Sequence, residues 1–141
     1  MNLYYRIKFA IIDFWYDLCR RCQCFMRGYS WSDVWNMDCW FKRTVKPMLI
    51  HLRDNGIGVP NELYLQGAEN EREAWENVLT EMIECIDMMD EDNVRESLGF
   101  TEWDYMRRMT YIDWKRVSDT MDASKNRFFE LFSKYFFSLW D

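Results

Sequence analysis

A chain of 141 residues with 49% hydrophobic residues is long enough for one domain with its own core, and this content excludes a disordered protein despite the net charge of -6. Only five Gly and two Pro occur, and this scarcity of turn residues argues against many short strands and for a few long helices. Aromatic residues make up 18% of the chain, more than the core needs, so some rings are expected at contact surfaces.

The charge is distributed unevenly along the chain. Residues 1–60 contain nine Lys or Arg and five acids, whereas residues 61–141 contain nine Lys or Arg and nineteen acids. This asymmetry fits one end that binds anionic partners, or self-association through opposite charges; the alternative is that the charges lie on solvated helix faces. Without a transmembrane window or the layout of a cleavable signal, and with five cysteines expected as reduced thiols, the sequence indicates a cytoplasmic protein.

The first predicted helix spans residues 3–25. Apolar residues at steps of three and four form one stripe that is expected to be buried: Leu3, Ile7, Ile11, Phe14, Leu18, Cys22 and Phe25. Gly28 follows as a left-handed stop, and Ser30 is expected to cap the next helix, with Asp33 in its first turn. The basic residues of this helix could lie on an anionic membrane surface, although its acids and the net charge argue against that alternative.

The second predicted helix starts after Ser30 and ends at Asn55. One face carries Trp31, Val34, Phe41, Val45, Met48, Leu49 and Leu52, with Asp38 among them. Proline removes a hydrogen bond from a helix interior, so we expect a kink or a break at Pro47. Residues 55–67, rich in Gly and Asn, are predicted to form the longest loop.

Asp38 is the most unusual residue of this helix. A carboxylate on an apolar stripe is costly unless it is paired or hydrogen-bonded, so the sequence predicts partners for it. It could accept bonds from an indole, a Tyr hydroxyl or an Arg and lock the bundle, or it could face a ligand. The candidate binding residues are therefore Tyr29, Trp31, Asp33, Trp35, Asp38 and Trp40.

The third predicted helix covers about residues 69–90, and a helical turn is expected over residues 94–98. Its apolar face carries Trp75, Val78, Leu79, Met82, Ile86 and Met89. The acids Glu81, Glu84, Asp87 and Asp90 repeat the spacing with which all-helical nucleotide pyrophosphatases hold magnesium. The alternative is a solvated acidic face, because these acids lie away from the apolar stripe.

From Thr101, a predicted N-cap, apolar steps of three and four continue to Ser138. This long pattern fits one coiled-coil-like helix or two helices, and we expect a break within residues 121–125. Residues 128–140 are apolar on nearly all sides and should lie in the core or at a subunit interface. The candidate interface residues are Phe129, Phe132, Phe136, Phe137 and Trp140.

These patterns predict an all-α fold, a compact bundle of four to five helices with a long C-terminal helical segment, in a single domain over residues 1–141. Catalytic signatures are weak. His51 is the only histidine, and Cys19-x-x-Cys22-x-Cys24 lies within a helical pattern, which favours ordinary thiols over a zinc site. There is no phosphate-binding glycine loop and no DNA-binding motif, so no catalytic residue, metal or cofactor is predicted.

Three parts of the chain carry a recognisable pattern: Arg27-Gly28-Tyr29-Ser30 followed by Asp33 and Trp35-Asn36-Met37-Asp38, then Leu52-Arg53-Asp54-Asn55 and Trp75 with Leu79, Met82 and Ile83, and the ending Lys134-Tyr135-Phe136-Phe137-Ser138-Leu139-Trp140-Asp141. This pattern resembles a family of small uncharacterised tailed-bacteriophage proteins. It covers residues 1–90 and about 125–141, so residues 94–122 look like an insertion. Met37 stands where Leu or Phe is expected.

The resemblance implies a phage gene product that acts in the cytoplasm of the infected host, or in the virion, and it implies no reaction. The expected function is that of a non-enzymatic helical binding protein, a homo-oligomer, that engages a host or anti-phage defence component through its aromatic surface. One alternative is a nucleotide or cyclic-nucleotide sponge, in which Trp35 or Trp40 stacks on a base, or a magnesium-dependent all-α nucleotide pyrophosphatase. Another is a structural component of the virion.

Overall fold

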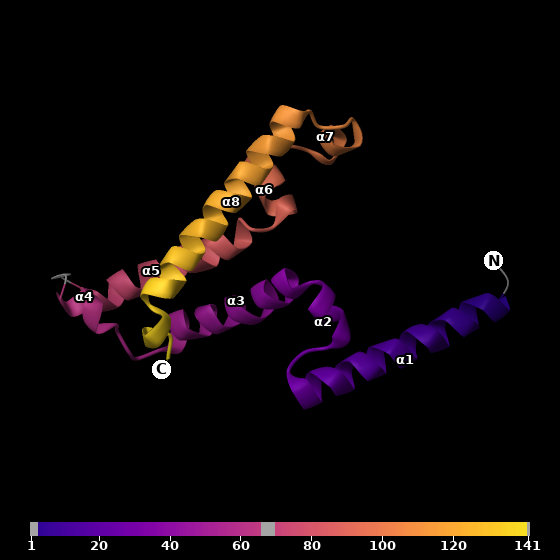
Figure 1. Cartoon of the computed structure of the whole chain (residues 1–141), viewed down its shortest axis with the longest axis horizontal. Helices are drawn as coiled ribbons and strands as arrows, with labels where there is room; N and C mark the ends of the chain where they lie inside the picture. The colour runs from indigo at the N-terminus through magenta and orange to yellow at the C-terminus, as the bar shows by residue number, and fades with distance from the viewer. Residues whose placement is uncertain (1–2, 66–69, 141) are drawn as a thin grey trace. The chain divides into compact units, whose positions relative to one another are not determined.

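The computed structural model describes residues 3–65 and 70–140. These residues form eight α-helices and one short 3-10 helix, with no β-strand among them, which confirms the predicted all-α fold (Figure 1). The chain divides into two compact units, unit 1 at Met1–Thr44 and unit 2 at Val45–Asp141. This division does not decide the prediction of a single domain over residues 1–141, or of an insertion at 94–122, and both stay predictions.

Unit 1 contains α1 (Leu3–Arg27), α2 (Trp31–Trp35) and the first part of α3 (Met37–Asn55). Helix α1 ends as its sequence predicted. Gly28 has a φ of 78°, a left-handed conformation that residues with a Cβ rarely adopt, and its amide donates to the Cys24 carbonyl at 2.9 Å. The glycine therefore terminates α1 and leaves Ser30 to cap α2.

The predicted second helix is interrupted at Asn36, and of the kink or break expected at Pro47 the break is absent. Asn36, with φ -128° and ψ 56°, separates α2 from α3, while α3 continues through Pro47 without a break. Proline removes one intrahelical hydrogen bond there. The turns that follow it are held by tertiary packing, because Leu49 and Leu52 are buried, and this packing stabilises the helix beyond the proline.

No apolar side chain described in unit 1 is buried. The predicted stripe of the first helix is therefore exposed instead of buried over its described side chains, Ile7, Ile11, Phe14, Leu18, Cys22 and Phe25; the side chain of Leu3 lies outside them. A stripe of this kind predicts burial only where another element covers it. Among the described residues, no helix is both long and apolar enough to cross a membrane.

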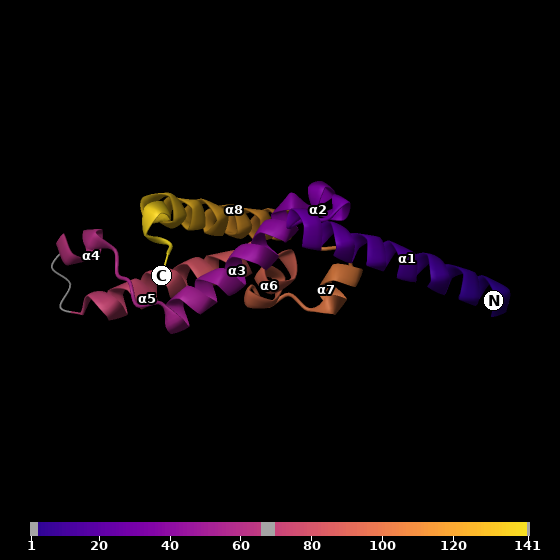
Figure 2. The same cartoon turned by 90° about the horizontal axis from the view of Figure 1, so that it is seen from below.

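Unit 2 contains the second part of α3 and all of the buried apolar residues described. Its further elements are α4 (Asn61–Leu65), α5 (Glu71–Asp87), α6 (Glu91–Ser97), α7 (Glu102–Met106), α8 (Tyr111–Lys134) and the 3-10 helix η1 (Phe136–Ser138). Helices α5 and α8 lie side by side in both views (Figures 1 and 2), and α6 packs on α8. Their facing surfaces form the core.

The core confirms the predicted apolar face of the third helix. Five residues of α5 are buried, Trp75, Leu79, Met82, Ile83 and Ile86. Helix α8, on which α5 and α6 both pack, and its C-cap contribute the buried residues Val117, Phe128, Leu131 and Tyr135. The rings of Trp75 and Tyr135 lie 5.3 Å apart. At the rim of this contact, the guanidinium of Arg127 donates to both carboxylate oxygens of Glu81, at 2.6 and 3.2 Å.

The C-terminal segment is broken at its start and not within residues 121–125, so the expected position of the break is wrong. Helix α7 ends at Met106, Arg108 adopts a left-handed φ of 66°, and Thr110 caps α8. The Asp113 carboxylate accepts from the Thr110 amide at 3.0 Å and from its hydroxyl at 2.6 Å. This capping box starts a new helix although the apolar steps continue across it.

The predicted loop at residues 55–67 contains a short helix, α4, whose Leu63 is buried; residues 66–69 lie outside those described. Arg72 of α5 links the two ends of this segment, because its guanidinium donates to the carbonyls of Arg53 and Gly56, where α3 ends. A Cβ on Gly56 would lie 2.4 Å from the Leu52 carbonyl oxygen. Glycine is therefore required where α3 ends.

We expect Leu79→Ala to lower the free energy of unfolding by about 2–5 kcal/mol, because it leaves a cavity at a side chain with 0% exposure in the α5–α8 contact. Ile112→Ala, at a side chain that is 69% exposed on α8, should change it by less than about 0.5 kcal/mol. Urea denaturation followed by circular dichroism measures both variants. Equal losses in the two would contradict this assignment of the core.

Candidate functional site

The predicted binding residues gather around the start of α2. Ser30 is buried, and the Asp33 carboxylate accepts from its amide at 2.7 Å and from its hydroxyl at 2.6 Å. Arg43 of α3 donates to the other Asp33 oxygen at 2.7 Å. The side chain of Asp33 is only 10% exposed, so this carboxylate holds α2 to α3 and offers little surface to a ligand.

These contacts change the acidity of Asp33. Hydrogen bonds from the Ser30 hydroxyl and amide, supported by Arg43, lower its pKa from 3.8 to about 2. The carboxylate is therefore ionised at any physiological pH, and its charge is used by the local structure.

The tryptophans of this region are exposed. Trp31 and Trp35 lie edge to face with ring centroids 5.6 Å apart, and Tyr29 is exposed as well, whereas Trp40 is half-buried. Trp31 also borders a pocket of about 530 Å³ between α1 and α2, together with Trp15 and Arg20 of α1. The structure thus brings two of the predicted rings, Trp31 and Trp35, together on an open surface.

Asp38 is not the buried polar centre that its position predicted. Its side chain is 75% exposed, in the first turn of α3, and lies 3.7 Å from Lys42. A hydrogen bond from the Cys39 amide and the charge of Lys42 lower the pKa of the Asp38 carboxyl. Leu49 and Leu52 of the same face are buried, but the face is exposed where α3 starts, so the Asp38 carboxylate remains in water.

The acids proposed for magnesium are used by the fold. Glu81 pairs with Arg127, Asp87 pairs with Lys46 of α3, and Asp90 accepts from the Asp92 amide as the N-cap of α6. Glu84 is exposed. Within residues 3–65 and 70–140, no group of three or more His, Cys, Asp and Glu side chains could hold a metal ion.

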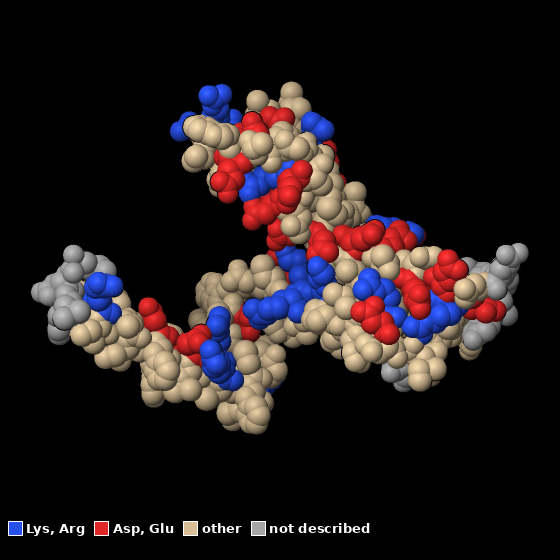
Figure 3. Space-filling model, turned by 180° about the vertical axis from the view of Figure 1, so that it is seen from behind, with Lys and Arg blue, Asp and Glu red and all other residues tan. Residues whose placement is uncertain are grey.

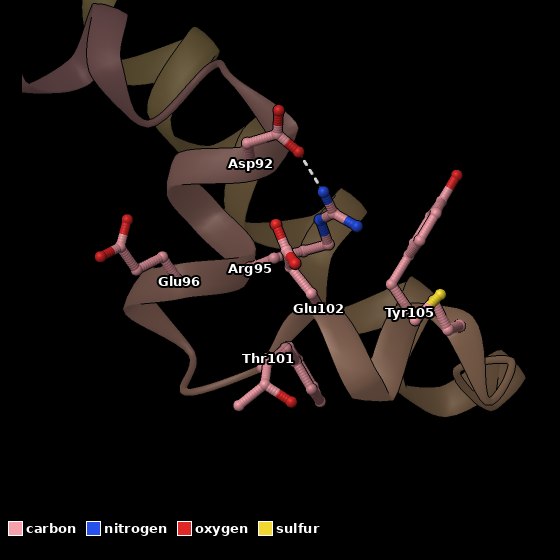
Figure 4. A pocket seen from close by; sticks show the side chains of 8 residues that line it. Asp92, Arg95, Glu96, Thr101, Glu102 and Tyr105 are labelled. Atoms are coloured by element: carbon pink, nitrogen blue, oxygen red, sulfur yellow. Dashed lines mark hydrogen bonds and ion pairs between the residues drawn. The ribbon is translucent and has the colours of Figure 1, made fainter.

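A first cavity of unit 2, about 690 Å³, lies between α6 and α7. Figure 4 shows Arg95 between Asp92, to which it donates, and the ring of Tyr105, while Glu96 points away. The Arg95 guanidinium carbon lies 4.5 Å from the centroid of Tyr105. Its buried Nε has no hydrogen-bond partner among the described residues, although Glu91 lies 3.7 Å away.

The charge of this cavity limits what it can accept. Three acidic residues line it, Asp92, Glu102 and Glu96, although the Glu96 carboxylate points away, and Arg95 is the one basic residue of its lining. Their excess negative charge repels phosphate, and Arg95 already covers Tyr105. The cavity therefore suits a basic side chain better than a nucleotide.

A second cavity of unit 2 is an apolar groove of about 590 Å³. The second part of α3 forms one wall with Val45, Pro47, Met48, Leu49, His51 and Leu52, and the C-terminal segment forms the other with Phe132, Phe136, Leu139 and Trp140. We call this cavity the C-terminal groove. Aliphatic, Met and aromatic side chains converge there, and His51 is the only titratable group of its lining.

Three of the five candidate interface residues, Phe132, Phe136 and Trp140, line this groove. Phe129 instead packs edge to face on Phe128 at 5.2 Å, and Phe137 is exposed outside the groove. Sequence reasoning missed the α3 wall. The spacing of Val45, Met48, Leu49 and Leu52 marked a helical face, but not that the chain's end lies against it.

Comparisons with models of protein families, with curated proteins and with solved structures find no match for this chain.

The stability of unit 1 should depend on the ionisation of Asp33. Because its folded-state pKa is below 3.8, ionised Asp33 stabilises unit 1 above pH 3.8, and this contribution is lost as the pH falls to about 2. Ser30→Ala removes the hydroxyl donor and should raise the pKa of Asp33 toward 3.8. Carbon NMR of the Asp33 carboxyl across the acid range measures this midpoint.

Ser32→Ala is the matched control. The Ser32 hydroxyl contacts the Ser30 hydroxyl, and the hydrogen bonds of the described residues include none from Ser32 to Asp33. It should leave the Asp33 midpoint near that of the wild type. A wild-type midpoint at 3.8, or one that Ser30→Ala does not move, would show that the capping contacts are not formed in solution.

Proposed function

We propose that this chain is a phage-encoded, non-enzymatic helical binding protein that seats an apolar segment of a host or anti-phage defence protein in the C-terminal groove. The phage origin and the kind of partner rest on the resemblance of the Arg27-Gly28-Tyr29-Ser30 and C-terminal motifs. The binding surface rests on the geometry of the groove. Its place of action would be the cytoplasm of the infected cell.

The single observation that carries the proposal is the convergence of α3 and the C-terminal segment on one open apolar cavity. Trp140 is 68% exposed at its edge, and Met48 and Phe136 are exposed beside it. Aromatic and Met side chains around a partly desolvated hollow are typical of the centres of protein interfaces. A folded chain gains nothing by leaving such rings in water, whereas a partner that covers them gains their burial.

The lining favours a protein segment over a small polar ligand. Sites for small molecules combine apolar walls with a few convergent polar groups that fix orientation. Here His51 and the indole N–H of Trp140 are the only polar side-chain groups, so orientation must come from the shapes of several apolar side chains. An amphipathic helix or an extended apolar segment offers such side chains at regular spacing.

The nucleotide hypotheses have less support from the same structure. The acids of α5 pair with Arg127 and Lys46 or cap α6, and the cavity beside Arg95 has an excess of carboxylates. The exposed pair of Trp31 and Trp35 could still stack on a base. Nucleotide binding is therefore tested beside protein binding.

We expect Trp140→Ala to weaken binding of the partner by about 30-fold, the loss typical of one central aromatic side chain. Trp103→Ala is the matched control, because Trp103 is 66% exposed on α7 and does not line the groove. Immobilised wild-type and variant proteins are incubated with extract of infected cells, and retained proteins are quantified by mass spectrometry. The partner, once purified, is then titrated calorimetrically.

A protein retained by the wild type and Trp103→Ala, but lost with Trp140→Ala, supports the proposal. Equal retention by all three contradicts it. Nucleotides and cyclic dinucleotides are incubated with the same samples: recovery of intact ligand would indicate a sponge, and magnesium-dependent conversion an enzyme. The chain's presence in purified particles, without a partner in the extract, would indicate a virion component.

A further inference from the structure

Helix α1 exposes an unusually large number of apolar side chains to solvent. Over its 25 residues, eleven large apolar side chains are exposed, among them Phe14 at 69% and Trp15 at 62%. Among the described residues of unit 1, α1 packs on α2, a helix of only five residues. Such a surface calls for something that covers it.

The apolar side chains spread over most of the circumference of α1. At 100° per residue, five charged residues fall within about a quarter of a turn: Arg6, Asp13, Asp17, Arg20 and Arg27. Apolar residues occupy most of the rest, where Lys8 and Arg21 are the two charged residues, and their long side chains can extend toward water. A single partner helix covers a stripe about 100° wide. It would cover Ile11 and Leu18 and leave Ile12 and Tyr16, which lie on the far side of the apolar arc.

The charge of α1 is opposite to that of unit 2. Helix α1 carries five basic residues and two acids, and one of those acids, Asp17, is held by Arg20 at 2.8 Å and Arg21 at 3.2 Å. On the face of α1 drawn in Figure 3, blue atoms lie toward both ends, red atoms lie between them, and the remainder is tan. A cationic helix repels its own copy and is attracted to an anionic surface.

We propose that α1 lies flat in the interface of an anionic lipid bilayer, with its apolar arc toward the acyl chains and its basic residues at the headgroup phosphates. A wide apolar face with Trp and Phe, a narrow polar face with Arg, and low mean hydropathy are the properties of helices that bind in this way. Tyr5, Trp15 and Tyr16 suit the boundary because their rings are apolar and their tips are polar. Of the two acids of α1 that argued against this, Asp17 is paired with Arg20 and Arg21, and the negative net charge of the chain comes from unit 2.

Flotation of the full chain with vesicles tests this proposal. We expect the affinity of the chain for anionic vesicles, made of phosphatidylcholine and phosphatidylglycerol, to be about tenfold higher or more than its affinity for neutral vesicles of phosphatidylcholine alone. High salt should remove that preference. Ile11→Glu with Phe14→Glu should abolish binding to both vesicles. Ile112→Glu, an equally exposed apolar position on α8, should change neither.

Charge variants separate recognition of anionic lipid from nonspecific hydrophobic adsorption to vesicles. Arg6→Gln and Lys8→Gln should each weaken binding to the anionic vesicles by about fivefold and leave binding to the neutral ones unchanged. Circular dichroism checks that the variants keep their helix content. Trp140→Ala should bind vesicles like the wild type, so this proposal and the proposed function fail independently.

Equal binding to neutral and anionic vesicles would overturn the proposal, as would full binding by the Ile11→Glu and Phe14→Glu variant. If the chain binds neither vesicle, and light scattering shows a dimer that this variant converts to a monomer, a second copy covers α1 and the membrane is excluded. A monomer that binds neither vesicle also excludes it.

Discussion

The packing of α5 against α8 is the contact on which the described structure depends. Leu79 and Phe128 are both fully buried in unit 2, and the rings of Trp75 and Tyr135 lie 5.3 Å apart at one end of the contact. Because Tyr135 is the last residue before η1, its burial fixes where the chain leaves α8. The aromatic residues that follow are then placed against α3. The C-terminal groove is a consequence of this core, because Tyr135, which does not line the groove, fixes the position of the C-terminal wall.

The same core also explains why so many aromatic side chains remain in water. All buried apolar residues described belong to unit 2, so the apolar stripes of α1 and α2 have no interior to enter. Helical stability usually comes from the packing of an apolar face and less from propensity. The contacts found for α1 include the ion pairs of Asp17, the stop at Gly28 and the packing on α2, and none of them buries an apolar side chain among the described residues of unit 1. Exposed ion pairs contribute little, so an external surface is the remaining source of stabilisation.

The sequence predicted those features that neighbouring residues determine. Gly28 and Ser30 mark a helix stop and start in any context, and the face of α5 follows from its period. The incorrect predictions concern contacts between distant segments. Asp38 was expected to be buried because its stripe was assumed to be covered, and the steps of three and four across Thr110 concealed a new helix start. The groove could be predicted only in part, because its two walls, residues 45–52 and 132–140, are far apart in the sequence.

The C-terminal groove and α1 differ in what binding would require. The walls of the groove stand on a buried core, through Leu49, Leu52 and Tyr135, so a partner meets a surface that is already formed. Little conformational entropy is lost there, and with His51 as its only titratable group the contact should depend weakly on salt. Helix α1 has no core beneath it and carries excess positive charge. Its binding must supply part of its helical stability and should depend strongly on salt, because the attraction acts through screened charges. One chain thus combines a preformed apolar surface with a cationic helix that an anionic surface would complete.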